Sequence, residues 1–235
     1  NSNVAMGMDA MRANTTGTGN TAIGYSSMYE GTTTGSLNTM VGVSSGRKMT
    51  SGEQNSGVGI NAMEGNTTGS RNTAMGASSF STNSTGSDDT AVGHAALSSN
   101  TTGDNNTAVG RASLQTNTTG ANNTAVGFQS FNANTTGNDN VVVGRNALDA
   151  NTTANYNTAV GSIALGANTT GCRNTALGYA TLNLNQTGND NVAVGYAALN
   201  VNTGSNNTAV GYNSLFANTT GLRNTAVGNQ SSDAN

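Results

Sequence analysis

Asn106-Thr-Ala-Val-Gly-Arg-Ala-Ser-Leu-Gln-Thr-Asn-Thr-Thr-Gly-Ala-Asn122 is the stretch that decides the fold, because the next residue starts it again as Asn123-Thr-Ala-Val-Gly127. We number the positions of this repeat 1 to 17 from its first Asn. The glycine at position 5 recurs 17 residues apart, with one step of 18 and one of 16, at residues 7, 24, 42, 59, 76, 93, 110, 127, 144, 161, 178, 195, 211 and 228. A fixed short period is typical of a solenoid. Seventeen residues are too few for two helices, so the sequence predicts an all-β fold: a β-solenoid (β-roll or β-helix) of fourteen 17-residue coils.

Two columns of the repeat are apolar. Position 4 is Val, Ile, Leu or Met in every copy, and position 9 is Leu, Met or Phe in most. We therefore expect positions 4 and 9, such as Val109 and Leu114, to form the core. Alternate residues of a strand share a face, so position 3, nearly always Ala, should face the other way. Ala108, Ala125 and Ala159 would there allow close approach between chains.

Glycine and asparagine form further columns. Gly at positions 5 and 15 fits a backbone that needs positive φ or close contact between coils. Asn fills position 1 in every copy except one, where Asp89 replaces it, and a second Asn column runs through position 12. Amides stacked about 4.8 Å apart can bond to one another as ladders, and we expect such ladders in the Asn columns.

The regularity predicts one elongated repeat domain over residues 1–235, with irregular coils in 1–65 and regular coils in 66–235. The chain starts and stops within the pattern, which suggests a segment of a longer fibre or filament. In the third copy Gly46 replaces the leucine and Met49 replaces the asparagine. We expect Met49 to supply the missing apolar contact.

Composition excludes several classes of function. Only 8% of residues are charged and the net charge is −3, so there is no electrostatic case for binding nucleic acid. No apolar run is long enough to span a bilayer, and we expect no membrane insertion. Low hydrophobicity can also indicate disorder, but an apolar residue kept in register over fourteen copies favours a folded chain.

No catalytic set can be assembled from the sequence. The single histidine, His94, lies at position 6, where other copies carry many kinds of side chain, and the acidic residues are scattered. No nucleophile–base set, metal cluster or phosphate-binding loop emerges. We therefore predict a protein that is not an enzyme and uses no cofactor or metal. Cys172 lies in a turn, as a tolerated surface substitution or as one half of an interchain disulfide.

Two surface columns are candidate interaction sites. Position 6 carries aromatic residues that could grip a sugar chain, pack against a second chain, or simply stack and stiffen the coils: Phe128, Tyr179, Tyr196 and Tyr212. The position 12 asparagines lie in Asn-x-Thr sequons and could carry glycans in a secreted protein, although a structural turn is the favoured explanation. These are Asn66, Asn83, Asn100, Asn117, Asn134, Asn151, Asn168, Asn185 and Asn218.

The repeat Asn-Thr-Ala-Val-Gly-x-x-Ala-Leu resembles the Ser-Val-Ala-Ile-Gly repeats in head domains of trimeric autotransporter adhesins. It is still more similar to repeats of phage tail-fibre-like proteins, as in Asn191-Val-Ala-Val-Gly-Tyr-Ala-Ala-Leu199. The resemblance covers essentially the whole chain. It implies a left-handed β-roll, three chains side by side, a location outside the cell or on a virion or cell surface, and a role as a shaft or adhesive surface.

The sequence therefore favours the structural shaft of an extracellular fibre or filament. Its expected partners are other copies of the chain, in a homotrimer or filament, and cell-surface glycans. The alternative is a β-solenoid that binds ice or carbohydrate. An ice-binding face would use the Thr residues of position 2, but that column is expected to share the inward face with position 4.

Overall fold

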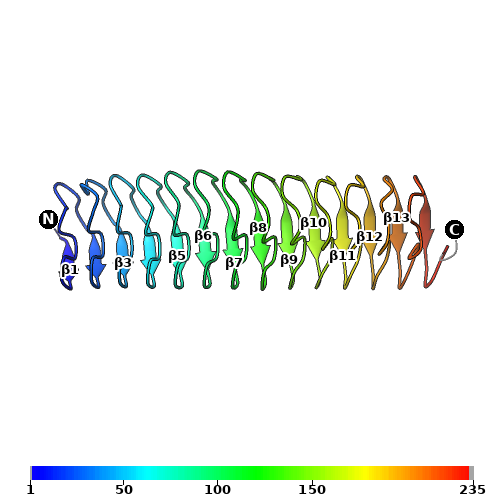
Figure 1. Cartoon of the computed structure of the whole chain (residues 1–235), viewed down its shortest axis with the longest axis horizontal. Helices are drawn as coiled ribbons and strands as arrows, with labels where there is room; N and C mark the ends of the chain where they lie inside the picture. The colour runs from blue at the N-terminus through cyan, green and yellow to red at the C-terminus, as the bar shows by residue number, and fades with distance from the viewer. Residues whose placement is uncertain (1, 233–235) are drawn as a thin grey trace. The chain divides into compact units, whose positions relative to one another are not determined.

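A computed structural model describes residues 2–232, which form two compact units, residues 2–119 and 120–232, each described by itself. The described chain is all-β and has no helices. Fourteen parallel strands, each three residues long, recur about once every 17 residues (Figure 1). Each unit is a β-solenoid, as the period predicted.

The strands of the first unit are β1 (Val4–Met6), β2 (Thr21–Ile23), β3 (Thr39–Val41), β4 (Ser56–Val58), β5 (Thr73–Met75), β6 (Thr90–Val92) and β7 (Thr107–Val109). Those of the second are β8 (Thr124–Val126), β9 (Val141–Val143), β10 (Thr158–Val160), β11 (Thr175–Leu177), β12 (Val192–Val194), β13 (Thr208–Val210) and β14 (Thr225–Val227). Within each unit every strand pairs with the next so that equal positions of the repeat face each other.

The strands face the opposite way from the sequence prediction. Position 3 is buried from β2 to β14, whereas positions 2 and 4 are half-exposed or exposed in every strand. The prediction that position 4 forms the core is therefore wrong, and Val109 lies on the outer face. Position 9 is confirmed as core, since Leu114 is fully buried. Alanine is small because it faces this crowded interior, so it cannot mediate contact between chains.

The backbone explains which side chains fill the core. In the regular coils position 9 has a φ near +50°, as in Leu114 at 51° and Leu165 at 52°. This left-handed conformation is especially unfavourable for β-branched residues. Position 9 is accordingly Leu, Met or Phe, and never Val or Ile, in copies with an apolar residue there. The β-branched valines of position 4 would therefore be unsuited to position 9.

In the irregular third coil, methionine side chains fill the core in place of the missing leucine. Met49 is fully buried, as expected, but Met40 at position 3 contributes as well. A Cβ added to Gly46 or to Gly57 would lie 2.8 Å or 2.7 Å from the Met40 side chain. Met40 thus occupies the room left by the missing leucine of its own coil and the missing alanine of the next. An unbranched, flexible thioether is suited to such gaps.

Candidate interaction surface

The outward side of the strands carries positions 2 and 4 of each coil, which we call the Thr/Val face. Its residues in β1–β14 are Thr, Ser, Val, Ile, Leu or Met, without one charged side chain. Val58, Met75, Val160 and Leu177 are 41%, 49%, 36% and 36% exposed. Rows lie about 4.8 Å apart and the two columns about 6.6 Å apart, from strand geometry. Contiguous exposed apolar surface of this kind marks sites of interaction.

The predicted aromatic column borders this face in the second unit. Tyr179 and Tyr196 stack with ring centroids 5.1 Å apart, and Tyr196 and Tyr212 with centroids 5.2 Å apart. Each ring is about half exposed. Phe128 is exposed in the same column of the repeat but in another coil.

This stacking limits what the tyrosines can bind. A sugar ring stacks on the face of an aromatic ring, but both faces of Tyr196 are covered by its two neighbours. Apart from the outer faces of Tyr179 and Tyr212, the column offers a partner its ring edges and phenol groups. Such a surface suits packing against another protein better than gripping a sugar chain, because aromatic pairs also associate edge to face.

The position 12 asparagines form the ladder that the sequence predicted. Asn83 Nδ2 donates to Asn66 Oδ1 at 2.7 Å and to Gly86 O at 3.0 Å. The proposed sequon residues Asn66, Asn83, Asn100, Asn117, Asn134, Asn151, Asn168, Asn185 and Asn218 are all buried. The amide nitrogen that would carry a glycan is thus inside the coil and used in hydrogen bonds, so the folded units cannot be glycosylated there. These asparagines serve the turn and the ladder instead.

A second ladder runs through position 1, where each Asn bonds to the backbone as well as to its neighbouring coil. Asn157 Oδ1 accepts the backbone N–H of Asn174 at 2.9 Å, and Asn157 Nδ2 donates to Gly171 O at 2.9 Å. One side chain thereby joins two coils and closes its own coil. This use of both a donor and an acceptor explains why position 1 is so uniformly Asn, a uniformity that was visible in the sequence.

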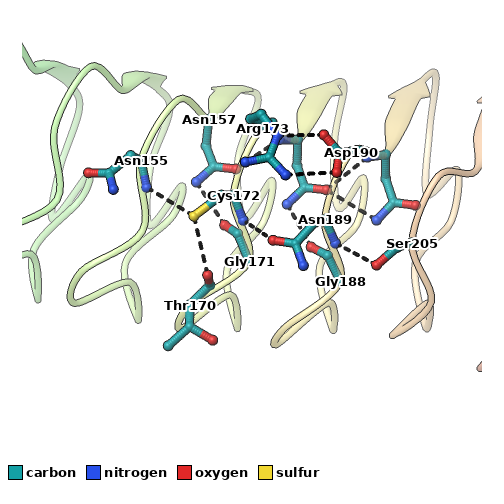
Figure 2. A network of polar contacts seen from close by, with 12 residues as sticks. Asn155, Asn157, Thr170, Gly171, Cys172, Arg173, Gly188, Asn189, Asp190 and Ser205 are labelled. Atoms are coloured by element: carbon teal, nitrogen blue, oxygen red, sulfur yellow. Dashed lines mark hydrogen bonds and ion pairs between the residues drawn. The ribbon is translucent and has the colours of Figure 1, made fainter.

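Cys172 belongs to a third ladder, at position 16 (Figure 2). From Asn155 to Ser205, each position 16 side chain accepts the backbone N–H of position 16 in the preceding coil, as Asn189 Oδ1 does from Cys172 at 2.8 Å and Ser205 Oγ from Asn189 at 2.9 Å. Cys172 Sγ accepts from Asn155 N–H at 3.5 Å and donates to Thr170 O at 3.5 Å. The thiol of Cys172 thus lies within this ladder, between Asn155 and Asn189, and is a weak acceptor.

Replacing Cys172 with serine should therefore leave the unfolding temperature unchanged or raise it slightly. A hydroxyl accepts the Asn155 N–H better than a thiol does, by roughly 0.5–1 kcal/mol at most. Cys172→Val, which has no acceptor, should lower stability by about 1 kcal/mol. Thermal unfolding by circular dichroism compares the three proteins. A serine variant less stable than the valine variant would contradict the role given to this ladder.

Charged groups are few and dispersed. Arg71 pairs with Asp88 and Arg173 with Asp190 through two hydrogen bonds each, in exposed turns (Figure 2 shows the second pair). His94 is exposed, as predicted. Within residues 2–232 no three His, Cys, Asp or Glu side chains come together as metal ligands. That same range includes no helix able to span a membrane.

Comparison with known proteins does not assign this chain to a family. No protein-family model, no curated protein and no solved structure matches the chain.

Proposed function

We propose that this chain is a structural repeat shaft of an extracellular fibre or filament, built by self-association through the Thr/Val face. The observation that carries the proposal is the uncharged, outward-facing Thr/Val face, repeated in every strand. An extracellular, virion or cell-surface location, and a likeness to tail fibres or adhesins, rest on the resemblance of the repeat.

The internal bonding of the coils supports a mechanical role. Within each unit, neighbouring coils are joined by strand pairing and by side-chain ladders at positions 1, 12 and 16. These bonds fix the spacing of the Thr/Val face from coil to coil. A partner with the same spacing, above all another copy of this chain, can match it over many coils. The mass of the assembly distinguishes a trimer of three chains from a filament of more chains.

Sedimentation equilibrium tests the proposal. The full chain should form oligomers at micromolar concentration, and the triple variant Val143→Lys, Val160→Lys, Leu177→Lys should be monomeric with an unchanged circular dichroism spectrum. The matched control is Thr136→Lys, Thr153→Lys, Thr170→Lys, which places the same charges at exposed position 14 of the repeat. That control should still associate. A monomeric parent chain would refute self-association through this face.

Ice binding is the second candidate, and one observation favours it. The threonines of position 2 face solvent, contrary to the sequence expectation, and with position 4 they form a regular array of hydroxyl and methyl groups. If this array binds ice, the chain will depress the freezing point of water below the melting point. Equal freezing and melting points, with normal crystal habit, would exclude it.

A further inference from the structure

Asp89 is the one residue of the first unit that departs from asparagine at position 1, and it is only 1% exposed. The asparagine one coil earlier, Asn72, accepts from Asp89 N–H at 2.9 Å and donates through Nδ2 to Gly86 O at 2.8 Å. Asp89 keeps the accepting half, since its Oδ1 accepts from Asn106 N–H at 2.7 Å. Its other oxygen, Oδ2, is buried without a hydrogen-bond partner.

The missing hydrogen bond at Oδ2 indicates which protonation state of Asp89 fits this buried site. By the register of the repeat, Oδ2 stands where an asparagine has its NH₂ group, and the carbonyl that this group would reach is Gly103 O. A carboxylate would place two acceptors together in a buried site, which is costly. A carboxylic acid restores the donor.

We propose that Asp89 is held as a carboxylic acid whose Oδ2–H donates to Gly103 O, so that this proton closes the coil of residues 89–105 and its loss opens the first unit there. The proton replaces the amide N–H that the other coils use. The solenoid therefore has one coil whose closure depends on pH.

The electrostatic surroundings agree with this assignment. Burial is the main cause that raises the pKa of Asp89 to about 8. The carboxylates of Asp104 and Asp88 contribute in the same direction, and the hydrogen bonds from Asn106 oppose the shift. Arg71, one coil away, is bound to Asp88 at 2.6 Å and 2.7 Å. The guanidinium thus holds the neighbouring carboxylate rather than Asp89.

The sign of the pH dependence follows from linkage. The unfolded chain releases this proton near the ordinary Asp value of about 4, whereas the folded chain keeps it up to about pH 8. Between these values the folded state binds one proton more than the unfolded state. The unfolding equilibrium constant of the first unit should therefore rise by up to about tenfold per pH unit, and level off above about pH 8.

The proposal is tested by measuring the unfolding of the full chain from about pH 5 to about pH 9, in wild type and in Asp89→Asn. Linkage places the expected change in stability within this pH range. The variant should lose the alkaline decline in stability and should equal or exceed the wild type at high pH. Amide exchange of Asn106 should accelerate with pH, beyond its intrinsic rise, in the wild type only. Asp88→Asn is the matched control, because Arg71 lowers the pKa of this exposed carboxyl, and it should keep the alkaline decline. Retention of that decline in Asp89→Asn would overturn the proposal.

Two further measurements distinguish a bound proton from a bound cation at Asp89. Infrared difference spectra should show the carbonyl band of a protonated carboxyl at neutral pH in the wild type and not in Asp89→Asn. Asn157→Asp should import the same alkaline sensitivity into the second unit, where Asn157 makes both bonds of the column. If calcium or sodium ions, rather than acid, restored alkaline stability in the wild type alone, Asp89 would be a cation ligand and the proposal would fail.

Discussion

Replacement of Ala159 with aspartate is expected to unfold the second unit, while replacement of its neighbour Val160 leaves that unit folded. Ala159 in β10 is fully buried, and Val160 is 36% exposed on the Thr/Val face. An unpaired carboxylate in the interior costs at least about 3–5 kcal/mol, a large share of the stability of a small domain. On the outer face the same change should cost about 1 kcal/mol or less.

Urea unfolding of the two variants measures this difference, and sedimentation adds an independent reading. Ala159→Asp should lose the cooperative transition of the second unit. Val160→Asp should keep it but weaken self-association, because its charge lies on the proposed interface. If the two variants had equal midpoints, the assignment of inside and outside would be wrong. If Val160→Asp associated normally, the fold would stand and the proposed interface would not.

The sequence predicted the architecture because the period alone specifies it. Residues that recur every 17 positions must lie in register when coils stack, so the parallel strands and the Asn ladders followed directly. The exposed, stacked tyrosines and the exposed His94 followed from the variability of position 6. These conclusions depend only on which residues are equivalent between coils.

The direction of the side chains could not be read in the same way. Three strand residues show alternation, but alternation does not say which face is inside. The usual rule assigns the larger apolar residue to the core, and it fails for Val109 because Leu114 already fills the narrow interior. What the sequence does not show is the left-handed φ of Leu114, a conformation that disfavours side chains branched at Cβ and suits the leucine that fills the interior.

The wrong prediction of which strand face is buried also affected the prediction of the interaction surface. The sequence marked position 2 and position 4 as one stripe, which the structure confirms, but assigned that stripe to the interior. Turned outward, the same stripe supports self-association and removes the main objection to ice binding. The sequons show the converse case, because an Asn-x-Thr pattern signals a surface residue and here the Asn side chains are buried.

Gly161→Ala is expected to be nearly as damaging as a buried charge, although it adds a single methyl group. Gly161 has φ +137°, and a Cβ there would lie 2.3 Å from Gly178 O in the next coil. Backbone strain and overpacking of about 1–3 kcal/mol each give roughly 2–6 kcal/mol. Gly166→Ala, in the same coil, is the matched control: its φ is not left-handed, and the nearest atom is the flexible side-chain oxygen of Asn183 at 2.7 Å. That variant should stay within about 1 kcal/mol of wild type. Since coils at position 5 touch backbone to backbone, relaxation of one coil must displace the next. Comparable unfolding midpoints for Gly161→Ala and Gly166→Ala would therefore show that the coils can separate freely, which rigid stacking in the proposed shaft does not permit.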